Sequence, residues 1–259
     1  MSATVAVREQ LYIYGLVDTA DLPDQACLGQ GVAGGAVQIE GQGAIRALVS
    51  HVPPGEVAQT RRNMLSHTAV LERAMVTATV LPMRFGTVVP DLHTLIACIA
   101  RNAAPFRAAW QSIEGRVELG VKASWRDRVV YNEIIESDAA LFRLRNRLRN
   151  RPANETYYER VELGRQIEAA LTVRRTAEAQ AIIAELQPLA DRETELRTLD
   201  EDMILNRAFL VPRAKEAAFD LKMQQLGERH AARLTFRYVG PVPPYNFIQL
   251  HADWLAGGA

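Results

Sequence analysis

The stretch Val117–Trp125, VELGVKASW, decides how the second half of the chain folds. Apolar residues alternate in it with polar or small ones. The apolar set is Val117, Leu119, Val121, Ala123 and Trp125, and the polar or small set is Glu118, Gly120, Lys122 and Ser124. Successive side chains of a strand point to opposite faces, so this alternation predicts a half-buried β-strand. Because the strand opens a new run of elements, we place a domain boundary near Gly115, between domains 1–115 and 116–259.

The segments that follow this strand predict a mixed domain. They are, in order, an arginine-rich helix through Arg151, a break at Pro152, a helix over 157–190, a hairpin of 195–199 and 203–211 that turns at 200–202, a helix over 214–230 and a strand over 234–239. This is the β-α-β-β-α-β order of a ferredoxin-like sheet with an enlarged first helical crossover. We therefore expect a modified ferredoxin-like domain with a long helical insertion.

The segments that precede it predict an N-terminal α+β domain. The apolar run over 11–17 is typical of a strand buried on both faces, and shorter strands are expected at 37–39, at 45–49 and around Pro82. A helix is expected from about Thr60, because one set of residues recurs at helical spacing: Met64, Thr68, Leu71, Met75 and Ala78. A second helix, capped by Asp91, runs toward Trp110. The fold class is therefore α+β with two domains.

Composition and charge exclude several classes of protein. Of the 259 residues, 48% are hydrophobic and 23% charged, which is typical of a globular chain. Lys plus Arg and Asp plus Glu number 30 each, so no basic excess marks a nucleic-acid partner. No apolar run approaches the roughly 18 residues of a membrane helix, and the N-terminus shows no export signal. Cys27 and Cys98 have no metal-type spacing, so we expect reduced thiols in a soluble cytoplasmic protein.

A search for catalytic chemistry finds no active centre. Gly29–Gly34 spells G-x-G-x-x-G but is followed by a strand, so we interpret it as a loop without a bound cofactor. His67 on the helix from Thr60 is either a hydrogen-bonded or surface histidine, or a general base, and the first interpretation is favoured. The acidic groups 191–195 and 200–202 are interpreted as solvated turns and not as metal ligands. The arginine series 143–151 is interpreted as a solvated helix face that could meet an acidic partner.

Three polar or aromatic features stand out from this pattern. Arg84-Phe85 and Asn206-Arg207 each place a polar or charged group within an otherwise apolar strand, where burial demands a partner inside the fold or at the domain junction. The segment 240–247, GPVPPYNF, follows the last predicted strand, and we call it the hook. The Pro243-Pro244 pair in it cannot continue the sheet. Tyr245 and Phe247 either pack back on the protein or contact a partner, and both readings stay open here.

Several stretches together resemble one known family. They are LYIYGLV at 11–17, VLPMRFGTVV at 80–89, VELGVKASW at 117–125, ILNRAFLVPR at 204–213 and the hook. In this order, across nearly the full chain, they are similar to the gas vesicle protein F/L family. The resemblance implies a non-enzymatic accessory protein without cofactors, in the cytoplasm or at the gas vesicle, and an α+β domain followed by a modified ferredoxin-like one. It implies contact with the hydrophobic shell protein and other gas vesicle accessory proteins.

We expect the partner contacts to lie at the polar and aromatic features described above. The predicted contact residues are Arg84, Phe85, Asn206, Arg207, Phe209, Pro243, Pro244, Tyr245, Asn246 and Phe247. They combine a fixed backbone, aromatic area and forked donors, which are common at interface anchors. The alternatives are a small-molecule-binding module or enzyme on a ferredoxin-like scaffold, and a passive component of the vesicle wall. A polar pocket with His67 or Asp91 would favour the module.

Overall fold

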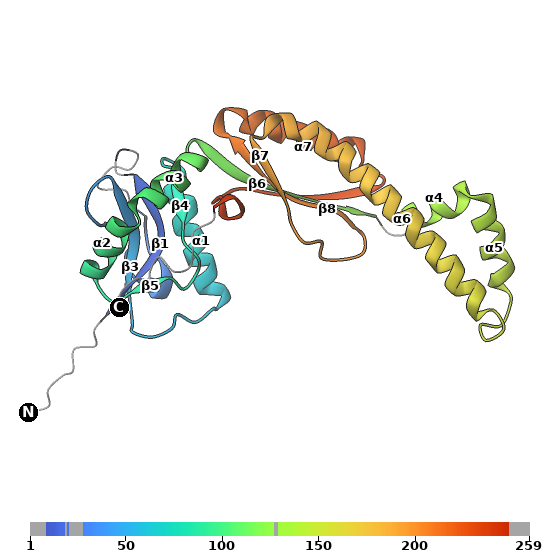
Figure 1. Cartoon of the computed structure of the whole chain (residues 1–259), viewed down its shortest axis with the longest axis horizontal. Coiled ribbons are helices and arrows are strands. Elements are labelled where there is room, and N and C mark those ends of the chain that lie inside the picture. The colour runs from blue at the N-terminus through green and yellow to red at the C-terminus, as the bar shows by residue number, and fades with distance from the viewer. Residues whose placement is uncertain (1–8, 19, 21–27, 127–128, 249–259) are drawn as a thin grey trace, which may run out of the picture. The chain divides into compact units, whose positions relative to one another are not determined.

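The computed structural model describes residues 9–18, 20, 28–126 and 129–248 (Figure 1). These residues form two β-sheets and seven α-helices, so the α+β prediction is confirmed. Contacts group the chain into two compact units: unit 1 holds the described residues up to Glu118 and those from Pro241, and unit 2 is Leu119–Gly240. The boundary near Gly115 stays a prediction. Cys27 and His251 lie outside the described residues.

Unit 1 is built on an antiparallel sheet in the order β2-β3-β1-β4, with β5 also paired to β1. Helices of the same unit contact β1, β4 and β5. The elements are β1 (Gln10–Asp18), η1 (Val32–Gly34), β2 (Gln38–Glu40), β3 (Ile45–Val52), α1 (Arg61–Met75), β4 (Val80–Pro82), β5 (Val88–Val89), α2 (Leu92–Arg101), α3 (Ala103–Ile113) and η4 (Tyr245–Phe247).

Strand β1 is the centre of unit 1, as its apolar run predicts. All seven of its inner residues are buried, and the strand is central in the sheet, since β3 pairs with one edge while β4 and β5 pair with the other. A Cβ atom on Gly15 would lie 2.9 Å from the carbonyl oxygen of Leu81, so only glycine allows β4 to approach this closely. The register with β3 shifts between Ile13 and Gly15, which is a β-bulge at Tyr14.

Helix α1 forms where predicted, but its buried face is rotated from the expected one. The buried residues are His67, Val70, Leu71, Ala74 and Met75, whereas Met64 is 51% exposed. Spacing alone placed Met64 on the buried face, since a broad apolar stripe allows more than one orientation of the helix. Helix α2 begins as expected, because the Asp91 carboxylate accepts a hydrogen bond from the Thr94 amide at its N-terminus.

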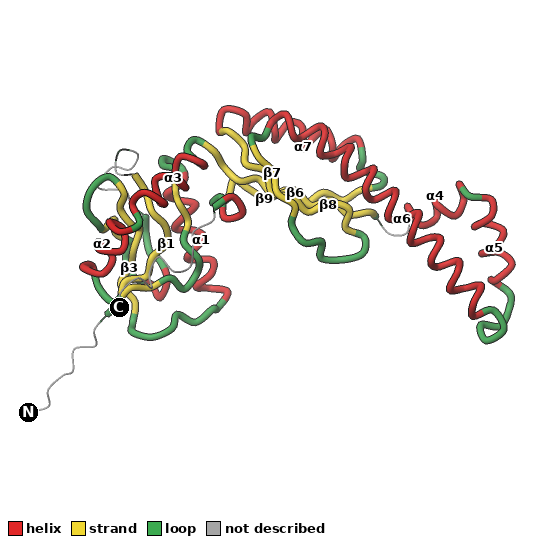
Figure 2. The backbone as a smooth tube through the Cα atoms, in the orientation of Figure 1, coloured by secondary structure: helices red, strands yellow, loops and turns green. Residues whose placement is uncertain are grey.

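Unit 2 is built on a four-stranded sheet in the order β7-β8-β6-β9. Helices α6 and α7 contact each other, and α6 also contacts β8; Figure 2 shows both helices along one face of the sheet. The chain passes between the units within β6 and again within β9. The elements are β6 (Arg116–Trp125), α4 (Val129–Ser137), α5 (Ala139–Arg149), α6 (Tyr157–Leu186), η2 (Gln187–Leu189), β7 (Arg192–Glu195), β8 (Met203–Pro212), η3 (Arg213–Lys215), α7 (Glu216–Arg229) and β9 (Leu234–Val242).

The predicted hairpin is present, but its first strand was placed wrongly. The strand is β7, which pairs with β8 from Arg192 opposite Leu210 to Glu195 opposite Arg207. The segment 196–202 is a loop, not a strand and tight turn. Its backbone is held partly by Asn206, whose side-chain amide donates to the Arg197 carbonyl at 2.6 Å. A side-chain hydrogen bond therefore replaces the sheet pairing expected for this segment.

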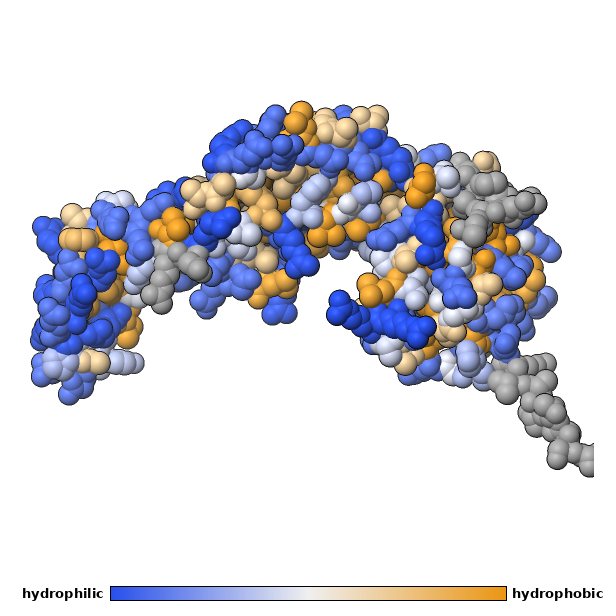
Figure 3. All heavy atoms as spheres, turned by 180° about the vertical axis from the view of Figure 1, so that it is seen from behind, coloured by the Kyte–Doolittle hydropathy of each residue, from blue (hydrophilic) through white to orange (hydrophobic). Residues whose placement is uncertain are grey.

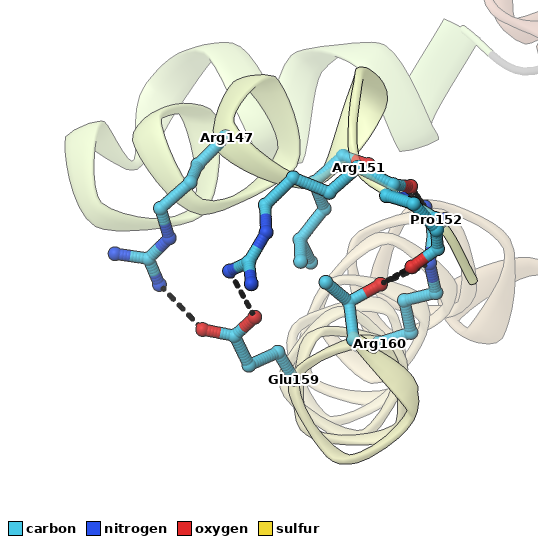
Figure 4. Close-up of polar contacts among 7 residues, drawn as sticks. Arg147, Arg151, Pro152, Glu159 and Arg160 are labelled. Carbon is cyan, nitrogen blue, oxygen red and sulfur yellow. Dashed lines mark hydrogen bonds and ion pairs between the residues drawn. The ribbon is translucent and has the colours of Figure 1, made fainter. Parts of the chain in front are cut away.

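Helices α4, α5 and α6 lie between β6 and β7 in the chain, where two helical segments were expected, and each contacts the other two. The Glu159 carboxylate on α6 lies 3.5 Å from the Arg147 guanidinium and 3.4 Å from that of Arg151 (Figure 4). Arg160 donates to the carbonyl oxygens of Leu148 and Arg151, near the C-terminal end of α5. The side chains of these residues thus join α5 to α6 at the break that Pro152 introduces.

On the face drawn in Figure 3, apolar side chains are interspersed with hydrophilic ones over both units. Within the described part of the chain, no helix has the length and apolar character needed to cross a bilayer.

Candidate functional site

Strand β9 ends at Val242, three residues later than predicted, so the first three residues of the hook belong to the strand. The rest of the hook lies in unit 1. Pro243 has no amide hydrogen for the sheet, and the chain then makes a short turn, in which the Phe247 amide donates to the Pro244 carbonyl at 3.1 Å. Pro243, Pro244 and Phe247 are buried, whereas Tyr245 and Asn246 are exposed. Packing against unit 1 therefore fixes the hook and presents two of its side chains at the surface.

The hydroxyl of Tyr245 ends a buried chain of hydrogen bonds. It lies 2.9 Å from Nε2 of His67, and Nδ1 of His67 lies 2.9 Å from the Tyr12 hydroxyl. A neutral imidazole has one donor and one acceptor nitrogen, so the two phenols take the complementary roles. Tyr245 is 39% exposed, but His67 is 3% exposed and Tyr12 is fully buried. The hydrogen-bonded interpretation of His67 is thus the one that the structure shows.

Burial shifts the pKa values of this chain of residues. It lowers the pKa of His67 to about 4, against a smaller opposing effect of the Met83 backbone. It raises the pKa of the Tyr12 and Tyr245 phenols, since phenolate is disfavoured away from water. All three groups are therefore neutral at pH 7, and their hydrogen bonds form between uncharged partners.

Arg84 and Phe85 lie in the turn between β4 and β5, not in a strand as predicted. The Thr87 amide and hydroxyl both donate to the Arg84 carbonyl, and Gly86 has a φ of 88°, which favours glycine. The Gly86 amide donates to the Tyr12 hydroxyl at 3.1 Å. The ring of Phe85 meets the His67 ring edge-on, with centroids 5.8 Å apart. The turn and the hook therefore share His67 as a common support.

Five rings form one cluster within unit 1, which we call the aromatic cluster. The centroids of rings that contact one another lie between 4.8 and 5.9 Å apart. Tyr245 joins the cluster through its hydrogen bond to His67. The members are Tyr12, Tyr14, His67, Phe85 and Tyr245. Arg84 beside the cluster is exposed and, among the described residues, has no side-chain hydrogen bond or ion pair.

Glu118 holds the other side of the hook. It is 4% exposed, although the strand pattern groups it with the polar set. Its carboxylate accepts hydrogen bonds from the backbone amide of Asn246 at 3.0 Å and from the Asn246 side chain. Burial raises the pKa of Glu118, and the two bonds from Asn246 act against that rise. Glu118, which the alternation of the strand assigns to the polar face, is therefore buried and holds Asn246 through hydrogen bonds.

Asn206, Arg207 and Phe209 lie on β8 in unit 2 and have partners inside that unit. Asn206 is buried, and the Arg207 guanidinium lies 2.9 Å from the Glu193 carboxylate and 3.4 Å from that of Glu195. Phe209 is fully buried, with its ring centroid 5.4 Å from that of Phe219. These contacts fit the interpretation of polar groups paired inside the fold. In this structure Phe209 offers no ring area to a partner.

The geometry around His67 does not resemble an acid–base centre. A catalytic imidazole must reach a substrate proton, but His67 is buried and both ring nitrogens have phenol partners. Asp91 caps α2, and the G-x-G-x-x-G stretch leads into the three-residue turn η1 instead of a long helix. Within the described ranges, no three His, Cys, Asp or Glu side chains are grouped to hold a metal ion.

Comparison with known proteins now decides the family. The family described as "Gas vesicle synthesis protein GvpL/GvpF" matches residues 10–249 of the chain. This chain belongs to the GvpL/GvpF family. The expectation drawn from the five resembling stretches is confirmed, and the protein is a gas vesicle-associated one.

Named relatives of this chain and a solved structure support the assignment over nearly their full length. Gas vesicle protein F of Nostoc sp. (strain PCC 7120) is 31% identical over 93% of this chain and 98% of its own. Gas vesicle protein L2 of Halobacterium salinarum is 27% identical over 95% of this chain and 93% of its own. The crystal structure of GvpF from Anabaena sp. PCC7120 covers 94% of this chain and 99% of its own, with a TM-score of 0.83 and 31% identity.

Sequence reasoning about this GvpL/GvpF chain missed three residues of the site: Tyr12, Glu118 and, as a partner of the hook, His67. Tyr12 was interpreted only as part of a buried strand, and Glu118 only as part of a polar face. The usable signal for Tyr12 and His67 was a polar atom within an apolar segment, since a buried polar atom needs a partner. Nothing in the local sequence identifies that partner as Tyr245, 178 residues away from His67.

Replacing Tyr245 by Phe should lower the free energy of unfolding by about 1–3 kcal/mol, because Nε2 of His67 loses its partner while the ring stays. Urea denaturation followed by circular dichroism measures the change. Tyr157→Phe is the matched control, since this tyrosine is 63% exposed and should change stability by less than about 0.5 kcal/mol. Equal effects of the two substitutions would show that the bond between Tyr245 and His67 contributes nothing.

Proposed function

We propose that this protein is an accessory factor that binds the hydrophobic gas vesicle shell protein and assists nucleation and assembly of the vesicle. The observation that carries the proposal is membership of the GvpL/GvpF family over residues 10–249. The shell protein is apolar enough to aggregate before incorporation, and a factor that covers its apolar surface would keep it available. Retention as a minor component of the finished wall is compatible with the same activity.

We place the contact surface on unit 1, at the turn and the hook. Arg84, Tyr245 and Asn246 are exposed there, and Phe85 is half-buried. Pro243, Pro244 and Phe247 are assigned the role of positioning these side chains, because they are buried. An arginine beside rigid aromatic rings is a common composition for an interface anchor. Asn206, Arg207 and Phe209 are assigned to the internal packing of unit 2.

The aromatic cluster supports such a surface by fixing it before a partner arrives. Tyr245 and Phe85 both contact His67, and Gly86 donates to Tyr12, so neither the turn nor the hook must become ordered on binding. Ordering interface side chains costs roughly 0.5–1.5 kcal/mol for each flexible one. Preorganised rings can therefore meet an apolar partner with little loss of conformational entropy.

The proposal is tested by co-expressing this chain with the main shell protein, followed by affinity capture and sizing of the soluble fraction. We expect the shell protein to remain soluble and to co-elute with this chain. Aggregation of the shell protein to the same extent as in its absence, with none retained, would exclude direct shielding. Captured accessory proteins would then identify the partner.

Arg84→Glu should reduce co-elution of the shell protein by roughly fivefold or more, the effect of losing an interface contact of about 1 kcal/mol. Stability should be unchanged within about 0.5 kcal/mol, because the Arg84 side chain is exposed. Arg61→Glu is the matched control, since it makes the same charge reversal on exposed α1 of the same unit. A reduction shared by both variants would show a general charge effect and not a contact at Arg84.

The alternative, a small-molecule-binding module or enzyme, depends on a polar pocket that includes His67 or Asp91. His67 lies in the aromatic cluster and Asp91 caps α2, so neither supports this function. We accordingly propose that the protein acts by binding and not by catalysis.

We also propose that unit 2 is a modified ferredoxin-like domain. Its strands in chain order are β6, β7, β8 and β9, with α4, α5 and α6 in the first crossover and α7 in the second. The spatial order β7-β8-β6-β9 supports this layout, since both crossover connections join strands of the same sheet. The enlarged crossover is the feature that distinguishes it from the simple motif.

A further inference from the structure

Unit 2 contains a large cleft that the proposed function does not use. It has a volume of about 1010 Å³ and lies between α4, the middle of α6, the end of β6 and the loop 196–202. Trp125, Val130 and Met203 are its buried apolar side chains, while Tyr131 and Leu199 are 39% and 67% exposed. The cleft therefore offers apolar contact area to a side chain that enters from solvent.

Four carboxylates line the cleft and form no ion pair with its two arginines. They are exposed and, among the described residues, have no ion pair or side-chain hydrogen bond: Glu168, Asp200, Glu201 and Asp202. The two arginines of the lining have other partners. Arg126 donates to the Leu234 carbonyl at 3.3 Å, and Arg175 donates to the Glu201 carbonyl at 2.8 Å while its guanidinium lies over the Trp125 ring. The lining has an excess of negative charge.

Helix α5 of the same unit carries the complementary surface. Leu141 and Leu148 are its buried residues. Phe142, Arg145 and Arg149 recur at spacings of three and four, so they lie on one face, which we call the outer face of α5. Phe142 is 41% exposed, and the Arg145 guanidinium lies 5.2 Å from the centre of its ring.

The arginines of the outer face have no carboxylate partner among the described residues. Arg147 and Arg151 are different, because both contact Glu159 as Figure 4 shows. In the described part of the chain, the Arg145 guanidinium contacts the uncharged side-chain oxygen of Asn146 and the ring of Phe142. One unit thus carries an acidic, partly apolar cleft together with a basic, aromatic helix face.

From this complementarity we propose that the cleft binds the outer face of α5 of a second copy of this chain. The face cannot fill the cleft of its own copy, because α5 lies beside the first turns of α6, whereas the middle of α6 lines the cleft (Figure 2). Phe142 meets the apolar side chains of the cleft, and Arg145 and Arg149 meet its carboxylates. The formal net charge of zero leaves little repulsion between copies.

Such a contact joins two different surfaces, so a pair of copies keeps one free cleft on one copy and one free α5 on the other. A contact of this kind builds rings or open chains, not closed two-fold dimers. Exposed ion pairs at the rim make this contact sensitive to salt, because the Debye screening length is about 3 Å at 1 M ionic strength and about 10 Å at 0.1 M. The inference goes beyond the proposed function and does not depend on shell-protein binding.

The test is sedimentation velocity of the full-length protein over a concentration series, in ~50 mM and ~1 M NaCl. We expect species larger than a monomer at low salt and their loss at high salt. Asp200→Lys with Glu201→Lys should abolish assembly, as should Arg145→Glu with Arg149→Glu. Glu56→Lys with Glu72→Lys is the matched control, because it makes the same change of charge on exposed residues of unit 1 and should leave assembly intact.

The decisive sample mixes the cleft variant with the α5 variant in equal amounts. Each alone should be a monomer, but the mixture retains one intact cleft and one intact α5, so it should form a dimer and nothing larger. A wild-type protein that is monomeric throughout, or assembly that persists in either variant, overturns the proposal. If the wild type is monomeric and captures an accessory protein that the cleft variant does not capture, a basic segment of that accessory protein occupies the cleft instead.

Discussion

Lowering the pH from about 6.5 to 4 should reduce the free energy of unfolding by about 3 kcal/mol through His67 alone. Burial lowers the pKa of His67 from 6.5 to about 4 in the folded protein. As the pH falls below 6.5, the unfolded chain binds the proton first, so protonation stabilises the unfolded state. The stabilisation is therefore complete above pH 6.5 and is lost progressively down to about pH 4.

Glu118 acts in the opposite direction over part of this range. Burial raises its folded-state pKa, so the folded protein gains a proton before the unfolded chain does as the pH falls. The net slope of stability against pH is accordingly smaller than the contribution of His67. A His67→Gln variant isolates that contribution, because glutamine retains a polar side chain but does not titrate.

The measurement is urea denaturation of both proteins at several pH values between 7 and 4. The wild type should lose about 3 kcal/mol more than His67→Gln across this interval. Identical slopes for the two proteins would show that the pKa of His67 is not shifted by folding. Such a result would also exclude the buried, neutral state that the hydrogen bonds to Tyr12 and Tyr245 require.

Replacing Phe247 by Ala should reduce the free energy of unfolding by about 3–5 kcal/mol, the usual cost of deleting a buried phenylalanine ring. Phe247 is 5% exposed and lies at the end of the hook, so its loss leaves a cavity in unit 1. The effect should exceed that of Tyr245→Phe, which removes one hydrogen bond and keeps the ring.

Hydrogen exchange of the β1 amides measures this change within unit 1. Protection of β1 should fall in Phe247→Ala and remain at the wild-type level in Tyr158→Ala, whose side chain is 85% exposed. Unchanged protection together with loss of shell-protein capture would instead make Phe247 a contact residue. The substitution therefore decides between the two roles that the sequence leaves open for the hook.

Local patterns were sufficient for the elements whose burial is uniform or strictly periodic. The apolar run of β1, the strand β6 and the cap of α2 by Asp91 all form as expected, although the buried Glu118 interrupts the alternation of β6. The orientation of α1 and the position of β7 were not predictable in this way. Met64 fits the helical spacing but is exposed, and the segment 196–202 is a loop held by Asn206. In both cases, contacts that the local hydropathy pattern does not record decide the outcome.

The candidate site shows the same division. The sequence by itself determined that the sheet cannot continue through Pro243-Pro244, that Asn206 and Arg207 need partners, and that the chain belongs to a gas vesicle family. The partner expected for Arg84 is absent among the described residues, because this side chain is exposed. Only the tertiary structure decided that His67 joins Tyr12 to Tyr245 and that Glu118 anchors Asn246. The reason is physical: strand and helix patterns record the burial of neighbouring residues. A buried hydrogen bond joins atoms that only the folding of the whole unit brings within 3 Å.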